Sequence, residues 1–441
     1  MPCPFASQSL DLDAFYRRDL LKTALAVGGL SSLTACIEAR GAPDVPRGTD
    51  DRSAIPRRQY AWNEYLPRDP HGNLVFPRHQ LVLFFDYAGD GTPDPEERER
   101  VEAALRSLER AYQRGNGGNS PYRPGGTNVP GLLFTLGYSR RYFDRFEADL
   151  PADVDLPPVE SVLSRIDEPT GRGDEHDAAM VLVSDHVQVL LAVEHALFGR
   201  IDELNGVSMA DTFVDVFEQR ERRTGFIGPG VPRRELEMEE IPQQSPLGMG
   251  FISGFSDNQA TEDAVAFSGG PFADGTTQHV SRLTLDLERW YEEDDETRVQ
   301  LMFSTENTPD DTGKVGELLA SDSGLTREMG DDLGAEIDDH GLVGHTQKLA
   351  RARDEEFEPL LLRRSEAIST GEEKPGFNFT SLQQSVDHFV ETRRAMNGDD
   401  LDVETAHSGI LDYIEVQSRG NYLVPPRRLA ALPPVDPNDD G

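Results

Sequence analysis

The order of the apolar segments is the feature that most constrains how this chain can fold. Runs with buried-strand patterns alternate with amphipathic helices, and the second half repeats the theme of the first. This order is that of a ferredoxin-like unit. We therefore predict an α+β fold made of two ferredoxin-like halves (the dimeric α+β barrel type), each an antiparallel sheet with helices on one face. The predicted strands cover 80–85, 131–138, 178–184, the start of 280–290, and 377–381, and the predicted helices cover 95–114, 140–146, 185–197 and 386–396.

The first 36 residues have the pattern of an export signal. Arg17 and Arg18 open a twin-arginine motif, and an apolar run follows as far as Cys36. This run is too short for a membrane-spanning helix, which needs about 20 residues, so it predicts a signal peptide. It ends in Leu-Thr-Ala-Cys, which resembles a lipobox. We expect export by the twin-arginine pathway and lipid anchoring of Cys36 on the outer face of the cell membrane; an ordinary cleaved signal and an uncleaved anchor are the alternatives.

The segments that flank the two halves look irregular. Residues 37–78 carry Pro, Gly, Arg and Asp with little apolar periodicity, which predicts a flexible tether, and we expect residues 431–441 to be a disordered tail. The halves are placed at 79–245 and 246–430. The only cysteine besides Cys36 is Cys3, which would leave with the signal, so the mature chain must rely on its core instead of disulfides.

The charge of the chain indicates its environment. The net charge is −37, and only four of the 43 basic residues are lysine. Acid excess with few lysines is typical of a surface adapted to high salt, where ions screen the self-repulsion. The same charge argues against nucleic acid as a partner, because that binding needs a basic patch. The clean apolar segments argue against a wholly disordered chain.

One stretch of the second half, 341–365, joins a histidine to an apolar strand that ends in arginine. His345 lies in a Gly-His-Thr context, and Arg363 follows the apolar triplet 360–362. A neutral imidazole is a good iron ligand, and an arginine that stays charged can stabilise developing negative charge. The pattern is that of one face of a haem pocket, although a lone histidine is more often an ordinary surface or core residue.

The chain resembles the dye-decolorising peroxidases over about residues 80–426. The resemblance is carried by the order of several segments, above all the stretch with His345 and Arg363. It implies that haem b binds in the second half, that His345 is the proximal iron ligand and that Arg363 is the distal arginine. The other segments are Leu-Phe-Thr-Leu-Gly-Tyr-Ser at 133–139, Tyr-Phe-Asp at 142–144, Asp-His-Val-Gln-Val at 185–189, the strand-to-helix segment 280–290, and the ending at 410–414 and 422–426.

The family's distal signature, Gly-Xaa-Xaa-Asp-Gly, can be aligned here in two registers. The first places Ser253 in the position of the acid and keeps both glycines, including Gly254. The second keeps a glycine and places Asp257 in the acid position, with Asn258 in place of the second glycine, which asparagine tolerates. A carboxylate can move the proton that peroxide cleavage requires, whereas a serine without a partner cannot act as a base at neutral pH. Both registers remain open, as does a simple turn-capping role for Asp257.

Two further histidines are rival ligands, and no other motif competes. His340 lies in an acidic, loop-like context close to His345, and His279 precedes an apolar strand. No nucleophile elbow, paired zinc-ligand spacing or dinucleotide fingerprint is present.

The resemblance implies a haem-dependent peroxidase that reduces hydrogen peroxide with electrons from an unidentified reducing substrate. Arg363 and either Asp257 or Ser253 would form the catalytic side, and His345, Arg363 and Gly254 would bind the cofactor. The alternative is a non-catalytic lipoprotein that keeps the fold and either binds haem or has lost it. A homo-oligomer is compatible with either role.

Overall fold

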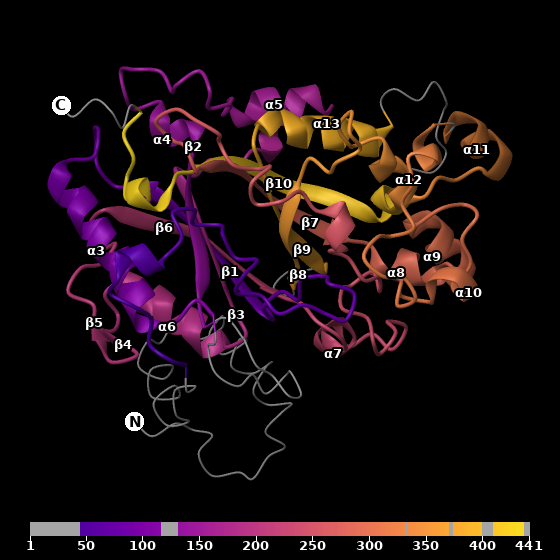
Figure 1. Ribbon diagram of the computed structural model, residues 1–441, viewed down its shortest axis with the longest axis horizontal. Helices are drawn as coiled ribbons and strands as arrows, with labels where there is room; N and C mark the ends of the chain where they lie inside the picture. The colour runs from indigo at the N-terminus through magenta and orange to yellow at the C-terminus, as the bar shows by residue number, and fades with distance from the viewer. Residues whose placement is uncertain (1–44, 116–130, 332, 370–373, 399–408, 436–441) are drawn as a thin grey trace, which may run out of the picture.

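The computed structural model describes residues 45–115, 131–331, 333–369, 374–398 and 409–435. The expected signal peptide and Cys36 lie outside these residues. In the described part, no helix is both long and apolar enough to cross a membrane. The molecule is elongated around a central barrel, with one group of helices at each end (Figure 1).

Eight antiparallel strands close the barrel in the order β1-β3-β2-β10-β7-β9-β8-β6. Within each half the strand order is that of a ferredoxin-like unit, β6-β1-β3-β2 in the first and β10-β7-β9-β8 in the second, which confirms the predicted fold class. Two short seams join the halves: β2 meets β10 and β6 meets β8. The strands are β1 (His79–Tyr87), β2 (Leu133–Ser139), β3 (Ala178–Ser184), β6 (Phe217–Phe226), β7 (Thr276–Leu285), β8 (Leu362–Ser369), β9 (Gly376–Gln383) and β10 (Ile414–Val424).

Helices cover the outer face of the first half and pack directly on its sheet. Asp94 caps α3 (Pro95–Ala111) through a capping box with Glu97, and Pro95 occupies the first turn. The buried face of α3 meets the outward side chains of β1, such as Leu83, in one continuous core. The other helices here are α4 (Arg140–Phe143), α5 (Val159–Arg165) and α6 (Val187–Leu197), with a small hairpin of β4 (Glu203–Leu204) and β5 (Val207–Ser208). The short helix α7 (Val231–Leu236) follows β6 in the connection to the second half.

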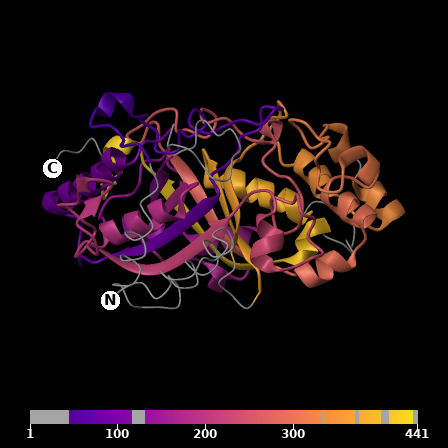
Figure 2. The same cartoon turned by 90° about the horizontal axis from the view of Figure 1, so that it is seen from below.

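The second half departs from this plan between β7 and β8. In the first half the corresponding connection, from β1 to β2, contains the single helix α3. Here the chain runs through five short helices that gather at the far end of the molecule (Figures 1 and 2). Only α13 crosses the outer face as α6 does in the first half. The five are α8 (Leu287–Glu292), α9 (Asp295–Met302), α10 (Pro309–Thr312), α11 (Leu333–His340) and α12 (His345–Ala350), and α13 is Val386–Asn397.

Both segments expected to be irregular pack against the barrel where the structure describes them. In place of a flexible tether, residues 45–78 bury Gln59, Tyr60 and Trp62 almost completely. At the other end, Leu432 and Val435 join the core instead of belonging to a disordered tail. Pattern analysis missed both because their buried side chains join cores formed by other elements and follow no sustained helix or strand period of their own.

Candidate functional site

A large apolar cavity opens between the outer face of the second sheet and the helices α12 and α13. The cavity volume is about 240 Å³. The total empty space, which includes open solvent at the mouth, is about 1670 Å³. Aromatic and aliphatic side chains form most of its wall. They include Leu283 and Leu285 of β7, Phe377 and Phe379 of β9, Phe389 and Met396 of α13, and Phe251 and Phe255 of the loop before β7.

His345 begins α12 and lines this cavity. Its position is held by buried neighbours: the Gln347 side chain accepts a hydrogen bond from the Gly344 N–H at 2.8 Å, and Thr346 Oγ1 donates to the Met302 carbonyl at 3.2 Å. A side chain at Gly344 would meet the Phe303 carbonyl, because an added Cβ would lie 2.1 Å from that oxygen. Close backbone approach therefore explains the glycine directly before the histidine.

The His345 imidazole is neutral at ordinary pH. Burial lowers its pKa to about 3, and the positive charges of Lys348, Arg363 and Arg393 act in the same direction. Its Nδ1 is buried and, among the described residues, has no hydrogen-bond partner. A neutral imidazole can use the lone pair of its unprotonated ring nitrogen to bind a metal.

Arg363 reaches the same cavity from β8, so the structure brings together the two residues that the sequence singled out. Its backbone N–H donates to Gln259 Oε1 at 2.8 Å. The register with β9 shifts between Arg363 and Ser365, which places Arg364 in a β-bulge. Arg364 is 2% exposed and is bound elsewhere, to Glu262, Asn63 and the Tyr60 carbonyl.

Of the two distal candidates, Ser253 lines the cavity and Asp257 does not. Asp257 is exposed, and its carboxylate accepts a hydrogen bond from Ser321 Oγ at 2.7 Å. Gly250 and Gly254 adopt φ of +96° and +81°, which glycine favours, whereas Asn258 is not among the residues with positive φ. These conformations match the register that keeps both glycines. Asn258 also lines the cavity, and it donates to Ser323 Oγ at 2.7 Å.

The two rival histidines lie elsewhere. His340 ends α11 and is exposed. His279 is fully buried, with hydrogen bonds of 2.8 Å to Asn421 Oδ1 and 2.5 Å to Ser281 Oγ, and it stacks on Phe389 at 3.5 Å between ring centroids. Its two ring nitrogens therefore already have partners, and burial lowers its pKa well below the usual value.

The charged part of the lining is entirely cationic. Arg353, Arg363, Arg393 and Arg419 line the cavity, and no aspartate or glutamate does so in the part of the chain that the structure describes. Arg419 is held by Glu168, with two contacts of 2.7 Å, and by Ser281 at 2.7 Å. Glu168 pairs with both Arg419 and Arg393 and compensates part of this charge. In a chain of net charge −37, a lining with arginines and no described carboxylate still favours a ligand with anionic groups.

Sequence analysis missed three of these arginines, although two had a detectable signal. Arg393 lies four residues after Phe389 and three before Met396, on the buried face of α13. Arg419, Asn421 and Leu423 lie two residues apart in β10, so they share one face of the strand. Each is a charge on an otherwise buried face, which is a reason to expect a function. Arg353 lies in a loop, where no period exists to reveal it.

These residues fit haem in three respects. The neutral His345 supplies a ligand for iron, apolar walls suit the porphyrin, and the arginines suit its carboxylates. Among the described residues, no cluster of three or more His, Cys, Asp or Glu could hold a bare metal ion.

Comparison with solved structures shows that the chain has the fold of the dye-decolorising peroxidases. A dye-decolorizing protein from V. cholerae superposes with a TM-score of 0.50 and 14% identity, over 84% of this chain and 98% of that one. A variant of DypB from Rhodococcus jostii RHA1 in complex with heme gives 0.51 and 13%, over 81% and 96%. At such identity the likeness concerns the fold.

Comparison of sequences places the chain in a family whose role is open. No curated protein matches it. The model of DUF7405, a family of unknown function, matches residues 77–426, which is most of the chain, and the protein therefore belongs to the DUF7405 family.

Proposed function

We propose that this protein binds haem in the cavity of its second half and reacts there with hydrogen peroxide. The observation that carries the proposal is the convergence of His345 and Arg363 on one apolar cavity whose charged lining is wholly cationic. The peroxidase fold and the heme complexes among proteins of similar structure support it.

In this proposal each residue has one task. His345 ligates the iron through the ring, because its imidazole is neutral and its Nδ1 has no other described partner. Arg393, Arg419 and Arg353 attract the carboxylates of the porphyrin. Gly254 allows the sharp turn that presents Ser253 to the cavity. The apolar wall excludes water and so strengthens every charge interaction inside.

Bound haem iron would supply the redox chemistry, accepting oxidising equivalents from peroxide and passing them to a reducing substrate. Arg363 stabilises the negative charge that develops as the O–O bond breaks. Ser253 can hold a hydrogen bond but cannot serve as a base at neutral pH. With Asp257 outside the lining, the proton would have to move through water or the peroxide itself, so we expect slow turnover.

A second function, haem binding without peroxide turnover, is favoured by one observation. A carboxylate is the usual group for moving a proton at neutral pH, and none lines the cavity among the described residues. In this case the protein would store or pass on haem.

Spectra and kinetics of the purified protein test both functions. Haem titration should produce a Soret band in the wild type and in His340→Ala, a matched control at an exposed histidine. His345→Ala should lose it or bind at least about tenfold more weakly. Arg363→Leu should keep the band and slow peroxide cleavage by about 10²- to 10³-fold. A wild-type protein with a Soret band and no turnover would select the second function, and one without haem binding would refute both.

We also propose that the protein is exported and lipid-anchored at Cys36, on the basis of the twin-arginine motif and the lipobox-like sequence. Replacing Cys36 with alanine should release the protein from the membrane fraction, and replacing Arg17 and Arg18 with lysine should block export. Unchanged membrane association of Cys36→Ala would refute the anchor.

A further inference from the structure

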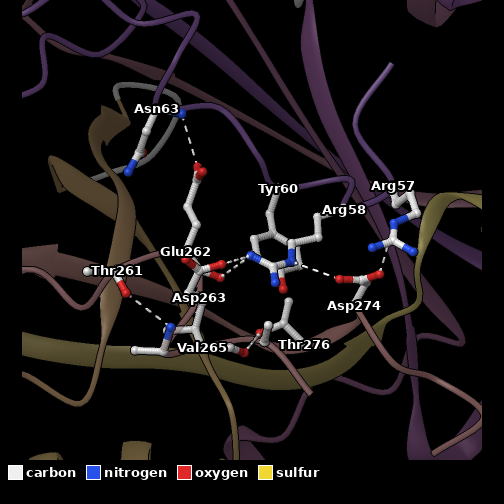
Figure 3. Close-up of polar contacts among 12 residues, drawn as sticks. Arg57, Arg58, Tyr60, Asn63, Thr261, Glu262, Asp263, Val265, Asp274 and Thr276 are labelled. Carbon is white, nitrogen blue, oxygen red and sulfur yellow. Dashed lines mark hydrogen bonds and ion pairs between the residues drawn. The ribbon is translucent and has the colours of Figure 1, made fainter. Parts of the chain in front are cut away.

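We propose that residues 57–66, here called the strap, are a positioning element for Arg363, acting through Arg364. The inference rests on the proposed function for its consequence in catalysis, but the mechanical link itself does not depend on haem. The strap precedes the barrel in sequence and lies against the loop 258–276 (Figure 3). It also contacts the strand β8 through Arg364.

Arg364 is the link between the strap and β8. It is 2% exposed, and its guanidinium donates to Asn63 Oδ1 at 2.7 Å, to the Tyr60 carbonyl at 2.8 Å and to Glu262. The guanidinium carbon also lies 5.4 Å from the centre of the Trp62 ring. Three of its contacts are therefore with the strap, and a planar fork of donors is required to make them together.

Glu262 completes a three-way junction. One of its carboxylate oxygens accepts hydrogen bonds from the backbone N–H groups of Trp62 and Asn63, at 2.7 and 3.0 Å, and from Arg364. Figure 3 shows its carboxylate turned toward the backbone of Asn63. The strap, the loop and β8 thus share one charge pair, in which Arg364 is buried and Glu262 is partly exposed. Removal of the Glu262 charge leaves the buried guanidinium uncompensated.

The junction fixes where Arg363 points. Arg363 and Arg364 are adjacent at a bulge, so anchoring Arg364 on the side of the strap leaves Arg363 on the side of the cavity. The same loop holds the strand a second time, because the Arg363 N–H donates to Gln259 Oε1 at 2.8 Å and the Ala260 N–H donates to the Leu361 carbonyl at 3.0 Å. If the contacts of the junction are lost, the bulge becomes more mobile and the Arg363 side chain is no longer held toward the cavity.

The strap is itself anchored to the barrel independently of Arg364. The buried Gln59 side chain donates to the carbonyls of Leu136 and Pro425, at 3.1 and 2.9 Å, and accepts from the Leu136 N–H at 2.9 Å. Arg58 pairs with Asp263 and Asp274 (Figure 3). A fixed strap can transmit a constraint to β8, whereas a mobile one could not.

Hydrogen exchange of the protein without haem tests the mechanical link. In Arg364→Met the Arg363 amide should exchange at least about tenfold faster than in the wild type, because the local opening that exposes it becomes easier. Glu262→Gln, a milder change, should have a smaller effect in the same direction. Asp263→Asn is the matched control, because Asp263 is the next residue and its carboxylate is exposed. It removes one contact of Arg58, but Asp274 still pairs with Arg58 and Gln59 still holds the strap to the barrel, so Arg363 should be unchanged.

Protection of β3 serves as an internal reference for the fold in each variant. Faster exchange at Arg363 with unchanged β3 supports the proposal. Unchanged exchange at Arg363 in both Arg364→Met and Glu262→Gln, with loosening confined to the strap, overturns it.

A double-mutant cycle in the haem-loaded protein tests the catalytic consequence. Arg364→Met should slow the second-order reaction with peroxide while haem affinity and the KM for the reducing substrate stay the same. In an Arg363→Leu background it should have no further effect, because the strap acts through Arg363. Additive effects would show a merely structural role and overturn the proposal. Failure to bind haem would refute the proposed function and leave the exchange result to decide on the strap.

Discussion

The two halves of the barrel share a strand order and differ in what lies beneath their helices. In the first half, α3 and α6 pack on the sheet through a continuous core of apolar side chains. In the second half only α13 crosses the sheet, and the chain from Asp286 to Leu361 folds into short helices beyond it, so a cavity remains. The same strand order thus supports a filled core in the first half and an open cavity in the second.

The difference shows that a binding cavity lowers the stability of the fold around it. Protein interiors are close-packed, and an apolar void forfeits dispersion contacts along its whole surface. The filled half and the closed barrel can compensate for this loss. A ligand that entered the cavity would regain the missing contacts, so binding and stability should be coupled in the second half and independent in the first.

Truncation of equivalent strand residues should give the largest contrast. Leu83 of β1 is completely buried in the filled core, and Leu283 of β7 lines the cavity. Leu83→Ala should cost about 2–5 kcal/mol of the free energy of unfolding, because it creates a new void. Leu283→Ala should cost only about 1 kcal/mol, because it widens an existing one. Urea unfolding of the ligand-free variants measures both, and equal losses would mean that the cavity is closed in solution.

Enlarging a side chain should again destabilise the filled half more than the half with the cavity. Ala104 of α3 is completely buried against the first sheet, and Ala352 lines the cavity. Ala104→Phe should destabilise the protein by about 1–3 kcal/mol through overpacking. Ala352→Phe should be close to neutral, since its ring has space to enter, and should abolish ligand uptake. Thermal melts with a haem titration check both, and a strongly destabilised Ala352→Phe would contradict the description of the cavity.

Lowering the pH should reduce the stability of the protein, because His345 is buried in its neutral form. Its pKa is about 3 when folded and near 6.5 when unfolded. Between these values the unfolded chain binds more protons, so the free energy of unfolding falls as the pH is lowered from about 6.5 to 3, by about 1.4 kcal/mol per pH unit at most. His345→Leu should show a correspondingly flatter profile in unfolding experiments from pH 7 to 4. Identical slopes in both proteins would show that the imidazole is solvated.

Salt should have the smallest and least local effect. Self-repulsion of the net charge of −37 is screened as ionic strength rises, so the Tm should increase by a few degrees from low to molar salt. Binding of an anionic ligand to the arginine-lined cavity should weaken in parallel, because the same ions screen its attraction. A Tm that does not respond would show that the acidity is no adaptation to salt.

The sequence by itself determined the elements and their order. Strand patterns such as that of β3 and helix signals such as Asp94-Pro95 before α3 are local, because pleat and helix periods are properties of a few neighbouring residues. Order then restricts topology, since ferredoxin-like units admit one arrangement of such elements. The prominence of His345 and Arg363 also came from the sequence, through the residues between them and a resemblance.

Tertiary structure decided which side chains meet. Whether Ser253 or Asp257 faces the cavity depends on how one loop packs, and both registers satisfy the same local pattern. Arg393 and Arg419 reach the site from elements distant in sequence, and the strap reaches Arg364 across some 300 residues. Contacts of this kind are set by the closure of the barrel, which brings together segments distant in sequence, and no period of neighbouring residues encodes them.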